Sequence, residues 1–218
     1  MKKKIKEVIC NRTPVRIFDP GLSPAAVIVP IYEKEGQYFI LLTERSIMVE
    51  NHGGRISFPG GRKKDSDGDL LQTALRECHE EIGVHPNDLE IVGKLDEAIT
   101  YITDLIVTPF LAFIPYPYPF KLECADVEAL IEIPFESLQA QADSQREKAA
   151  QGIRSNMISF DLHDYQMIWG ATARILKGFF DALHEYDVRQ NIKLAQNNQT
   201  KRASRLNISL PSSARKSK

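Results

Sequence analysis

Cysteine is scarce in this chain, and long apolar runs are missing. The three cysteines, Cys10, Cys78 and Cys124, form no Cys-x-x-Cys pair and leave an odd number, which favours reduced, non-structural thiols in a cytoplasmic setting. No apolar run approaches the ~18–20 residues that a helix needs to span a bilayer. The basic residues at positions 2–4 are not followed by the apolar region of a signal peptide. We therefore expect a cytoplasmic protein without a membrane segment.

A strong net charge is also absent. The 218 residues carry a formal net charge of −1, which provides no general attraction to nucleic acid or to a membrane surface. Apolar residues make up 43% of the chain, an ordinary share for a soluble globular protein, and the length is sufficient for one sizeable core. These values predict one enzyme-sized domain and no specific nucleic-acid partner.

The last part of the chain has no acidic residues. Residues 191–218 contain seven basic side chains and are rich in Asn, Gln and Ser. A segment with so few large apolar groups buries too little surface to fold alone. We expect residues 1–21 to be an N-terminal extension, 22–184 the folded domain, and 185–218 a basic, flexible tail. The tail is either a disordered terminus or an arm that weakly binds polyanions or a partner.

Apolar patterning in the folded part predicts an α/β protein. A hairpin is expected from strands 25–31 and 38–42, joined by residues 33–36. Further strands are expected at 89–93, 106–114, 127–133 and 155–162, and helices at 68–82, 134–138 and 166–183. Pro109 indicates a bulge or an edge in its strand. The last helix would place Trp169 in the core, an interpretation we favour over a base-stacking platform. The pattern predicts helices on both faces of a mixed sheet.

The segment 68–82 carries the most informative pattern. On a helix, Glu77, Glu80 and Glu81 fall at i, i+3 and i+4 and crowd one face, while a separate apolar stripe can dock on a core. Like charges at this spacing weaken a helix. A hard divalent cation would neutralise them, because Mg²⁺ favours a few carboxylates, retained waters and phosphate oxygens. The alternative interpretation is a solvated acidic face.

The turns around this helix favour the metal interpretation. Phe58–Gly61 form a turn that lets backbone approach a neighbour closely, and Gly83 is the usual residue for a left-handed helix cap. At this point the chain resembles the Nudix hydrolase family, whose box ends in Arg-Glu-aliphatic-x-Glu-Glu-x-Gly-aliphatic. Residues 76–84 match it, with Cys78 in the first aliphatic place. The resemblance implies a Nudix-type α/β/α sandwich with a mixed sheet.

The loop before the helix departs from the general family pattern in two ways. Between Gly61 and Arg76 it is one residue longer, and Asp67 takes the place of the upstream Glu of the box. A loop absorbs one extra residue at little cost in free energy. The resemblance implies that Arg76 orients the glutamates through charge-assisted hydrogen bonds, and that Asp67 steadies the loop through Arg76.

A second signature, together with this longer loop, resembles the coenzyme A pyrophosphatase branch of the family. That branch has Leu-Leu-Thr-x-Arg-Ser/Ala, then an arginine, a glycine and Phe-Pro-Gly-Gly. Residues 41–46, Gly54 and 58–61 agree with it, but Glu50 stands where the branch has the arginine. If residue 50 faces the ligand, a carboxylate there would repel a polyanion. We then expect coenzyme A, if cleaved, to be a poor substrate.

The resemblance also implies a set of site residues. Glu77 and Glu81 would hold Mg²⁺ or Mn²⁺, with Glu80 as a third ligand or as the holder of a coordinated water; the ions would bridge pyrophosphate oxygens and activate a water. With Arg76, these glutamates form the expected catalytic set. The expected substrate-binding residues are Arg45, Ser57, Phe58, Gly60 and Gly61. The catalytic base stays open between Asp126 and Glu128, either of which can equally be an exposed acid.

Two classes of function follow. The favoured one is a Mg²⁺-dependent pyrophosphohydrolase acting on a nucleoside diphosphate linked to another moiety, with coenzyme A or a derivative first and ADP-ribose, NADH or nucleotide sugars as alternatives. The other is a non-catalytic nucleotide-binding regulatory module. The complete set of helical glutamates and Arg76 favours the enzyme, because a regulatory module would be expected to have a degenerate box. We expect the partner to be a small-molecule nucleotide substrate, and a homodimer is compatible with this interpretation.

Overall fold

The structure is a computed structural model that describes residues 1–46, 54–100, 103–122, 124–153, 155, 157–162 and 166–207, with side chains described up to residue 197. Internal contacts divide the chain into two compact units. The first comprises Met1–Asp181 and contains the sheet and the site, and the second begins at Ala182. Within the described ranges, no helix is both long and apolar enough to cross a membrane.

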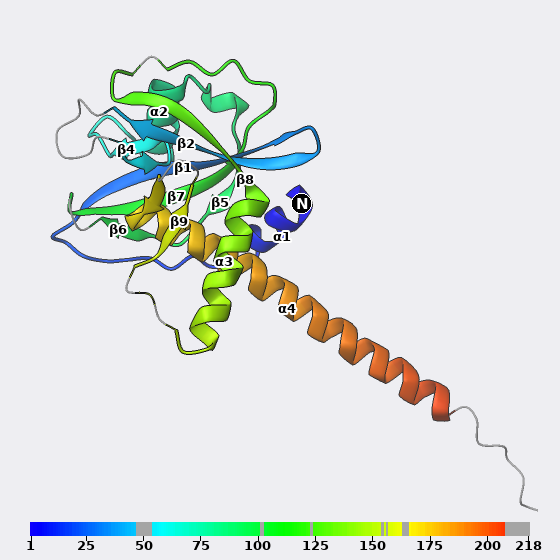
Figure 1. The fold of residues 1–218 in the computed structure, drawn as a ribbon. Coiled ribbons are helices and arrows are strands. Elements are labelled where there is room, and N and C mark those ends of the chain that lie inside the picture. Colours follow the sequence, from blue (N-terminus) through cyan, green and yellow to red (C-terminus); the bar gives the residue numbers. More distant parts are fainter. Residues whose placement is uncertain are drawn as a thin grey trace, which may run out of the picture. The chain divides into compact units, whose positions relative to one another are not determined.

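Strands dominate the first unit (Figure 1). The strands are β1 (Ser23–Lys34), β2 (Gln37–Arg45), β3 (Ile56–Ser57), β4 (Gly60–Arg62), β5 (Glu90–Lys94), β6 (Ala98–Thr100), β7 (Leu105–Phe113), β8 (Val127–Pro134), β9 (Ser159–Asp161) and β10 (Met167–Trp169). The helices are α1 (Lys2–Cys10), α2 (Leu70–Ile82), α3 (Phe135–Ala150) and α4 (Gly170–Asn207), with a 3₁₀ turn η1 (Pro86–Asp88).

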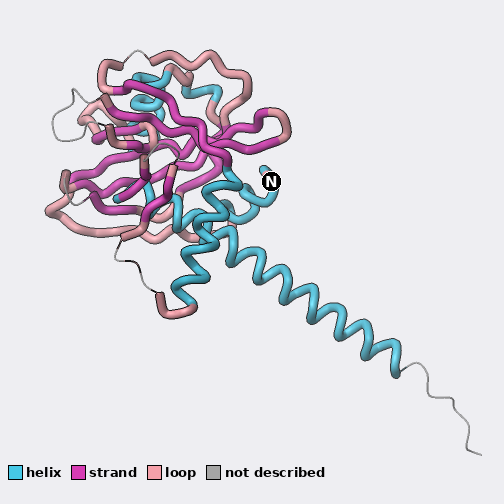
Figure 2. The backbone as a smooth tube through the Cα atoms, viewed as in Figure 1, coloured by secondary structure: helices cyan, strands magenta, loops and turns pink. Residues whose placement is uncertain are grey.

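The main sheet is mixed, as predicted. Its order is β3-β2-β1-β7-β5, with β4 paired to β1, β6 to β7 and β8 to β2. Only β1 and β7 run parallel among these described pairs, and the others are antiparallel. Figure 2 shows these strands crossing the first unit as one twisted layer, with β9 and β10 forming a separate two-stranded ribbon.

The predicted hairpin is confirmed. β1 and β2 pair antiparallel from Ile31↔Ile40 to Lys34↔Gln37, so that Glu35 and Gly36 form the two-residue turn. Both turn residues have positive φ, 53° and 79°. Two successive positive φ values define the mirror-image turn whose twist matches that of the flanking strands.

The core lies on both faces of this sheet. On one face, Ala26, Ile28 and Leu41 pack in one cluster with Cys78 and Ile82 of α2. Because side chains alternate along a strand, the neighbouring residues of β1 and β2 point to the other face. There α3 contacts β2 and β8, and Figure 1 shows α3 below the sheet. The predicted sandwich is therefore present, with Cys78 fully buried as a core residue.

Pro109 lies at neither an outer edge nor a bulge of its own strand, contrary to the expectation. β7 lies inside the sheet, where Pro109 pairs with Val27 of β1. On its other side, β7 pairs with β6 up to Val107 and with β5 from Phe110 onward. The proline therefore occupies the gap between two short partner strands, where a missing backbone N–H breaks no ladder hydrogen bond.

The helix expected at 166–183 is present as α4 but begins at Gly170, and the core position of Trp169 is wrong. Residues 167–169 form β10, in which Ile168 is fully buried while Trp169 is 37% exposed. Strand alternation explains this difference, because the side chains on either side of a buried residue point outward. Gly170, with a φ of 69°, then redirects the chain into α4. Two other elements differ in length: the short helix expected at 134–138 extends to Ala150, and the late strand covers only 159–161.

Both ends of the chain carry helices. Residues 2–10, expected as part of an extension, form α1 and belong to the first unit, because Ile5, Val8 and Ile9 are spaced for one apolar face and are buried. Instead of a tail without regular structure, α4 continues to Asn207. Residues 182–207 contain no Gly or Pro and are rich in Ala, Leu, Lys and Gln, which favour helix.

Candidate active site

The predicted acidic helix is confirmed as α2, and both of its ends have local causes. Asp69 precedes the helix, and its side chain accepts a hydrogen bond from the backbone N–H of Gln72 (2.8 Å). Such a cap satisfies one of the free donors of the first turn. At the other end Gly83 is left-handed, with a φ of 71°, and its N–H donates to the carbonyl of His79. The helix is thereby fixed in the register that presents the glutamates.

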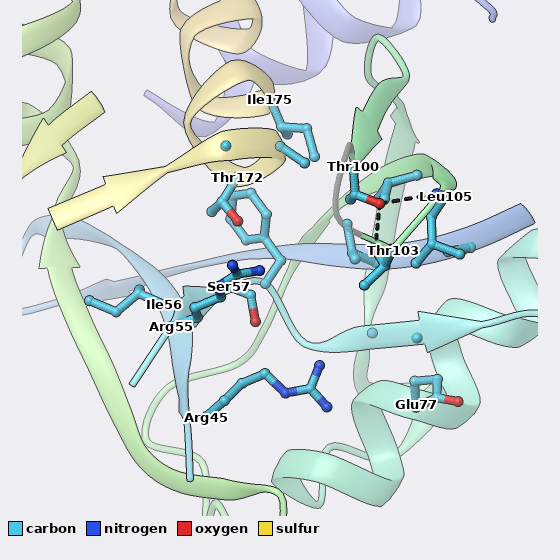
Figure 3. Close-up of a pocket in the computed structure, with 18 of the residues that line it drawn as sticks. Arg45, Arg55, Ile56, Ser57, Glu77, Thr100, Thr103, Leu105, Thr172 and Ile175 are labelled. Atoms are coloured by element: carbon cyan, nitrogen blue, oxygen red, sulfur yellow. Dashed lines mark hydrogen bonds between the residues drawn. The ribbon is translucent and has the colours of Figure 1, made fainter. Parts of the chain in front are cut away.

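Most of the predicted site residues line one cavity of about 1080 Å³ (Figure 3). The predicted residues that line it are Glu77, Glu80, Glu81, Arg45, Ser57, Phe58, Gly60 and Gly61. They come from α2, β2, β3 and β4, which meet at this end of the sheet. Cavities of about 300–1,000 Å³ hold small-molecule ligands, so this one has room for a nucleotide-sized substrate.

Arg76 does not line the cavity. Its Nε and Nη2 donate to the two carboxylate oxygens of Asp67, each at 2.8 Å, and its Nη1 donates to Glu77 (2.5 Å) and Glu80 (3.1 Å). Asp67 also accepts from the backbone N–H of Lys64 and from the Thr73 hydroxyl. The contact between Asp67 and Arg76 that the sequence predicts is thus present, and it ties the loop to the helix.

This network changes the proton affinity of Asp67 and provides a stability test. The Arg76 hydrogen bonds, above all, hold the pKa of the Asp67 carboxyl well below its usual range. A lowered folded-state pKa stabilises the fold above the unfolded pKa of about 4 and loses that contribution as the pH falls further. Asp67→Asn should therefore lower the melting temperature at pH 7, and the difference from wild type should shrink below about pH 4. Thermal melts across this pH range would check it; a difference independent of pH would contradict it.

Glu81 is the most buried of the three glutamates. It is 7% exposed, and its Oε2 accepts a hydrogen bond from the backbone N–H of Gly60 (3.0 Å). Burial raises the pKa of its carboxyl to about 7, with Glu77 and Asp126 adding to the rise, while Gly60 and Arg45 oppose it. The next residue, Gly61, approaches α2 so closely that a Cβ there would lie 2.6 Å from the Glu77 carboxylate. The predicted close approach of this turn to the helix is therefore realised.

The glutamates fit a hard divalent cation by their chemistry. Within the described ranges, no three His, Cys, Asp or Glu side chains converge into a ready-made metal cage. Mg²⁺ does not need one, because it is commonly held by one or two carboxylates, several waters and substrate phosphates. A cation beside Glu81 would also relieve the burial of a carboxylate that has Glu77 as its neighbour. The ligand set of Glu77, Glu80 and Glu81 stays a prediction.

The two candidates for the base are placed differently. Asp126 lines the cavity and lies 3.6 Å from a guanidinium nitrogen of Arg45. Glu128 is exposed on β8 and does not line the cavity. Position therefore favours Asp126.

The structure adds cavity residues that the sequence reasoning missed. Arg55 and Trp169 both line the cavity, and the Arg55 guanidinium lies 4.5 Å from the Trp169 ring centroid. Arg55 was missed because it lies in a variable stretch between two fixed positions of the second signature. Trp169 was missed because residues 166–183 were expected to form a helix with Trp169 on its buried face. Glu50, on which the substrate expectation depended, lies outside the described residues.

Comparison with known proteins identifies the family. The NUDIX domain matches residues 22–144. An uncharacterised Nudix hydrolase, NudL of Salmonella paratyphi B, is 32% identical over 154 residues, covering 70% of this chain and 79% of that protein. A MutT/nudix family protein from Enterococcus faecalis has the same fold, with a TM-score of 0.50 and 16% identity over 79% of this chain and 66% of that one.

The chain therefore belongs to the Nudix family. With this membership and the NudL relatives, it is a Nudix hydrolase, which decides against the regulatory module.

Proposed function

We propose that this hydrolase is a divalent-cation-dependent pyrophosphohydrolase that cleaves a nucleoside diphosphate linked to another moiety. One observation carries the proposal: four carboxylates and five cationic side chains line the same cavity. The carboxylates are Glu77, Glu80, Glu81 and Asp126, and the cations are Arg45, Arg55, Arg62, Lys64 and Arg174. Acids alone would repel a pyrophosphate, and cations alone would only bind one. The combination suits a polyanion that is held and attacked beside a metal ion.

Each residue has a stated task in this proposal. Glu77 and Glu81 would hold Mg²⁺ or Mn²⁺, with Glu80 as a further ligand or water holder; the bound ion would supply charge neutralisation and a more acidic water. Arg76 positions Glu77 and Glu80, and the Gly60 N–H positions Glu81.

Asp126 is proposed to accept a proton from the attacking water. The water oxygen bonds to one phosphorus as the bond from that phosphorus to the bridging oxygen breaks. Arg45, beside Asp126, offers its charge to the phosphate oxygens. The products are two phosphomonoesters.

Coenzyme A or a derivative is the first candidate substrate. Support comes from the second signature, whose two parts lie on neighbouring strands: Thr43 of β2 pairs with Ser57 of β3, and its hydroxyl donates to the Ser57 carbonyl. Arg45 and Phe58, from these two parts, both line the cavity. ADP-ribose, NADH and nucleotide sugars are the alternatives.

Metal removal tests the proposal. Hydrolysis of any accepted substrate should stop in EDTA and return when excess Mg²⁺ or Mn²⁺ is added, measured as phosphate released after coupling to a phosphatase. The panel should include coenzyme A, an acyl derivative, ADP-ribose, NADH and a nucleotide sugar. Cleavage that persists in EDTA would contradict it. If no compound is cleaved but a nucleotide raises the melting temperature, the proposed reaction is wrong while nucleotide binding stands.

Two further expectations stay predictions. The chain is expected to reside in the cytoplasm, and it is compatible with a homodimer. Light scattering coupled to size-exclusion chromatography would determine its oligomeric state.

A further inference from the structure

Two arginines lie directly opposite each other at the mouth of the cavity. The antiparallel register Thr43↔Ser57 and Glu44↔Ile56 continues outward to Arg45 and Arg55, where the Arg45 N–H donates to the Arg55 carbonyl at 2.9 Å. Like charges in directly opposite positions of a β-ladder destabilise it. Burial and the Arg45 charge together lower the pKa of the Arg55 guanidinium. The two guanidiniums therefore repel each other, and an anion bound between them would remove this repulsion.

Neither arginine is fully paired by the residues that the structure describes. Arg45 has Asp126 at 3.6 Å, yet its Nε is buried without a hydrogen-bond partner. For Arg55, no carboxylate among the described residues lies within ion-pair distance, and its contact is the face of Trp169. An aromatic face attracts a guanidinium but accepts no proton from its edge. Stacking therefore orients the planar group and leaves its N–H fork available for a bidentate anion.

Arg45 belongs to the proposed reaction site through Asp126, whereas Arg55 contacts Trp169. Both arginines line the cavity that Glu81 also lines, and the backbones of the two arginines are hydrogen-bonded to each other. In Figure 3 the Arg45 side chain extends across the cavity toward the side of Glu77, while Arg55 lies near Ser57. A ligand anchored at the glutamates would reach Arg55 with a more distant group.

We propose that Arg55, stacked on Trp169 and paired with Arg45, forms a second anion site that binds a phosphomonoester of the substrate other than the diphosphate being cleaved. This inference rests on the proposed function, since it names the group that the same cavity selects. The enzyme then prefers nucleotides that carry an additional phosphate on the ribose over the same nucleotides without it. A phosphate matches the paired forks of two guanidiniums in charge and in geometry. Arg55 is a specificity determinant here, and Trp169 is a positioning residue.

The single tryptophan of the chain makes a direct test possible. Trp169 is the sole tryptophan, so intrinsic tryptophan fluorescence reports on this site alone. The full-length protein is titrated in EDTA with adenosine 3′,5′-bisphosphate and, separately, with 5′-AMP. Wild type should change its emission with both and bind the bisphosphate at least about tenfold more tightly, a difference of about 1.4 kcal/mol. Because nothing is turned over in EDTA, the result does not depend on whether the proposed reaction occurs.

Variants assign the preference to Arg55. Arg55→Gln should bring the two dissociation constants to within about twofold of each other, and Arg55→Lys, which keeps the charge but not the fork, should retain part of the preference. Arg189→Gln makes the same change at an exposed position outside the cavity and should behave as wild type. Isothermal titration calorimetry repeats the measurement where the loss of the stacked arginine alters the baseline emission.

Three outcomes would overturn the inference. Wild type could bind both nucleotides equally or fail to bind the bisphosphate. Arg55→Gln could weaken both nucleotides by the same factor, which would place Arg55 on the 5′-phosphate that they share. Finally, Arg55→Gln could keep the full preference while remaining folded in a thermal melt. Failure of hydrolysis with an intact fluorescence preference would instead contradict the proposed reaction and leave the anion site standing.

Discussion

Replacing Glu81 with Gln is expected to lower kcat by orders of magnitude while the protein stays folded. The amide oxygen of Gln can still accept the Gly60 N–H that now reaches Glu81. Gln is also nearly as good a helix former as Glu, so α2 should persist. What is lost is a negative ligand beside Glu77, and with it the proposed place of the activating cation. Steady-state kinetics at saturating Mg²⁺ and a thermal melt would measure both effects.

A matched control separates this effect from a general loss of acidic charge. Glu136→Gln makes the same change in the first turn of α3, at an exposed position that does not line the cavity, and should leave kcat unchanged. If Glu81→Gln retained more than about a tenth of the wild-type turnover, the loss would amount to less than about 1.4 kcal/mol of transition-state stabilisation. A ligand role for Glu81 would then be wrong.

Gly61→Ala should inactivate the enzyme with little loss of stability. A Cβ at residue 61 would lie 2.6 Å from the carboxylate of Glu77, closer than two such atoms can approach. The obstructed group is the end of a flexible side chain, so Glu77 can move away and the fold survives. Displacing a catalytic group by about 1 Å can cost on the order of 100-fold in rate, and we expect a loss of kcat of that size. Kinetics with a melting curve would measure it.

Gly178→Ala provides the comparison for this variant. Its Cβ would meet Asp96 at 3.7 Å, an ordinary contact, on helix α4. It should keep wild-type turnover and gain slightly in stability, because Ala is favoured over Gly inside a helix. Should Gly61→Ala match it in turnover, the position of the Glu77 carboxylate would have no bearing on the rate.

The elements that the sequence predicts well are those with local causes. Helix α2 could be placed because glutamates at i, i+3 and i+4, an apolar stripe and Gly83 all act within one segment. The β1–β2 hairpin could be predicted because two apolar runs flank a short turn segment that is close in sequence to both. The contact of Asp67 with Arg76 was predicted by the resemblance to the Nudix box, and the structure contains it.

The features that escaped prediction depend on contacts between distant segments. Trp169 belongs to a strand because residues 167–169 pair with 159–161, and no local pattern distinguishes that short strand from the start of a helix. Arg55 becomes a cavity residue because β3 pairs with β2 and because Trp169 arrives from more than 100 positions away. The continuation of α4 to Asn207 reflects helix propensity. The prediction of a flexible tail considered the polar, basic composition of this segment and not its helix propensity.

The central claim is that this cavity hydrolyses the phosphoanhydride (P–O–P) linkage of a nucleoside diphosphate derivative. Ion-exchange chromatography of the products formed with Mg²⁺ from coenzyme A, ADP-ribose, NADH and a nucleotide sugar tests it most directly. The account predicts that at least one compound yields two phosphomonoesters in equal amounts, and that Glu81→Gln yields neither at a comparable rate. The absence of any such pair of products from wild type, or cleavage at another bond, would contradict the claim.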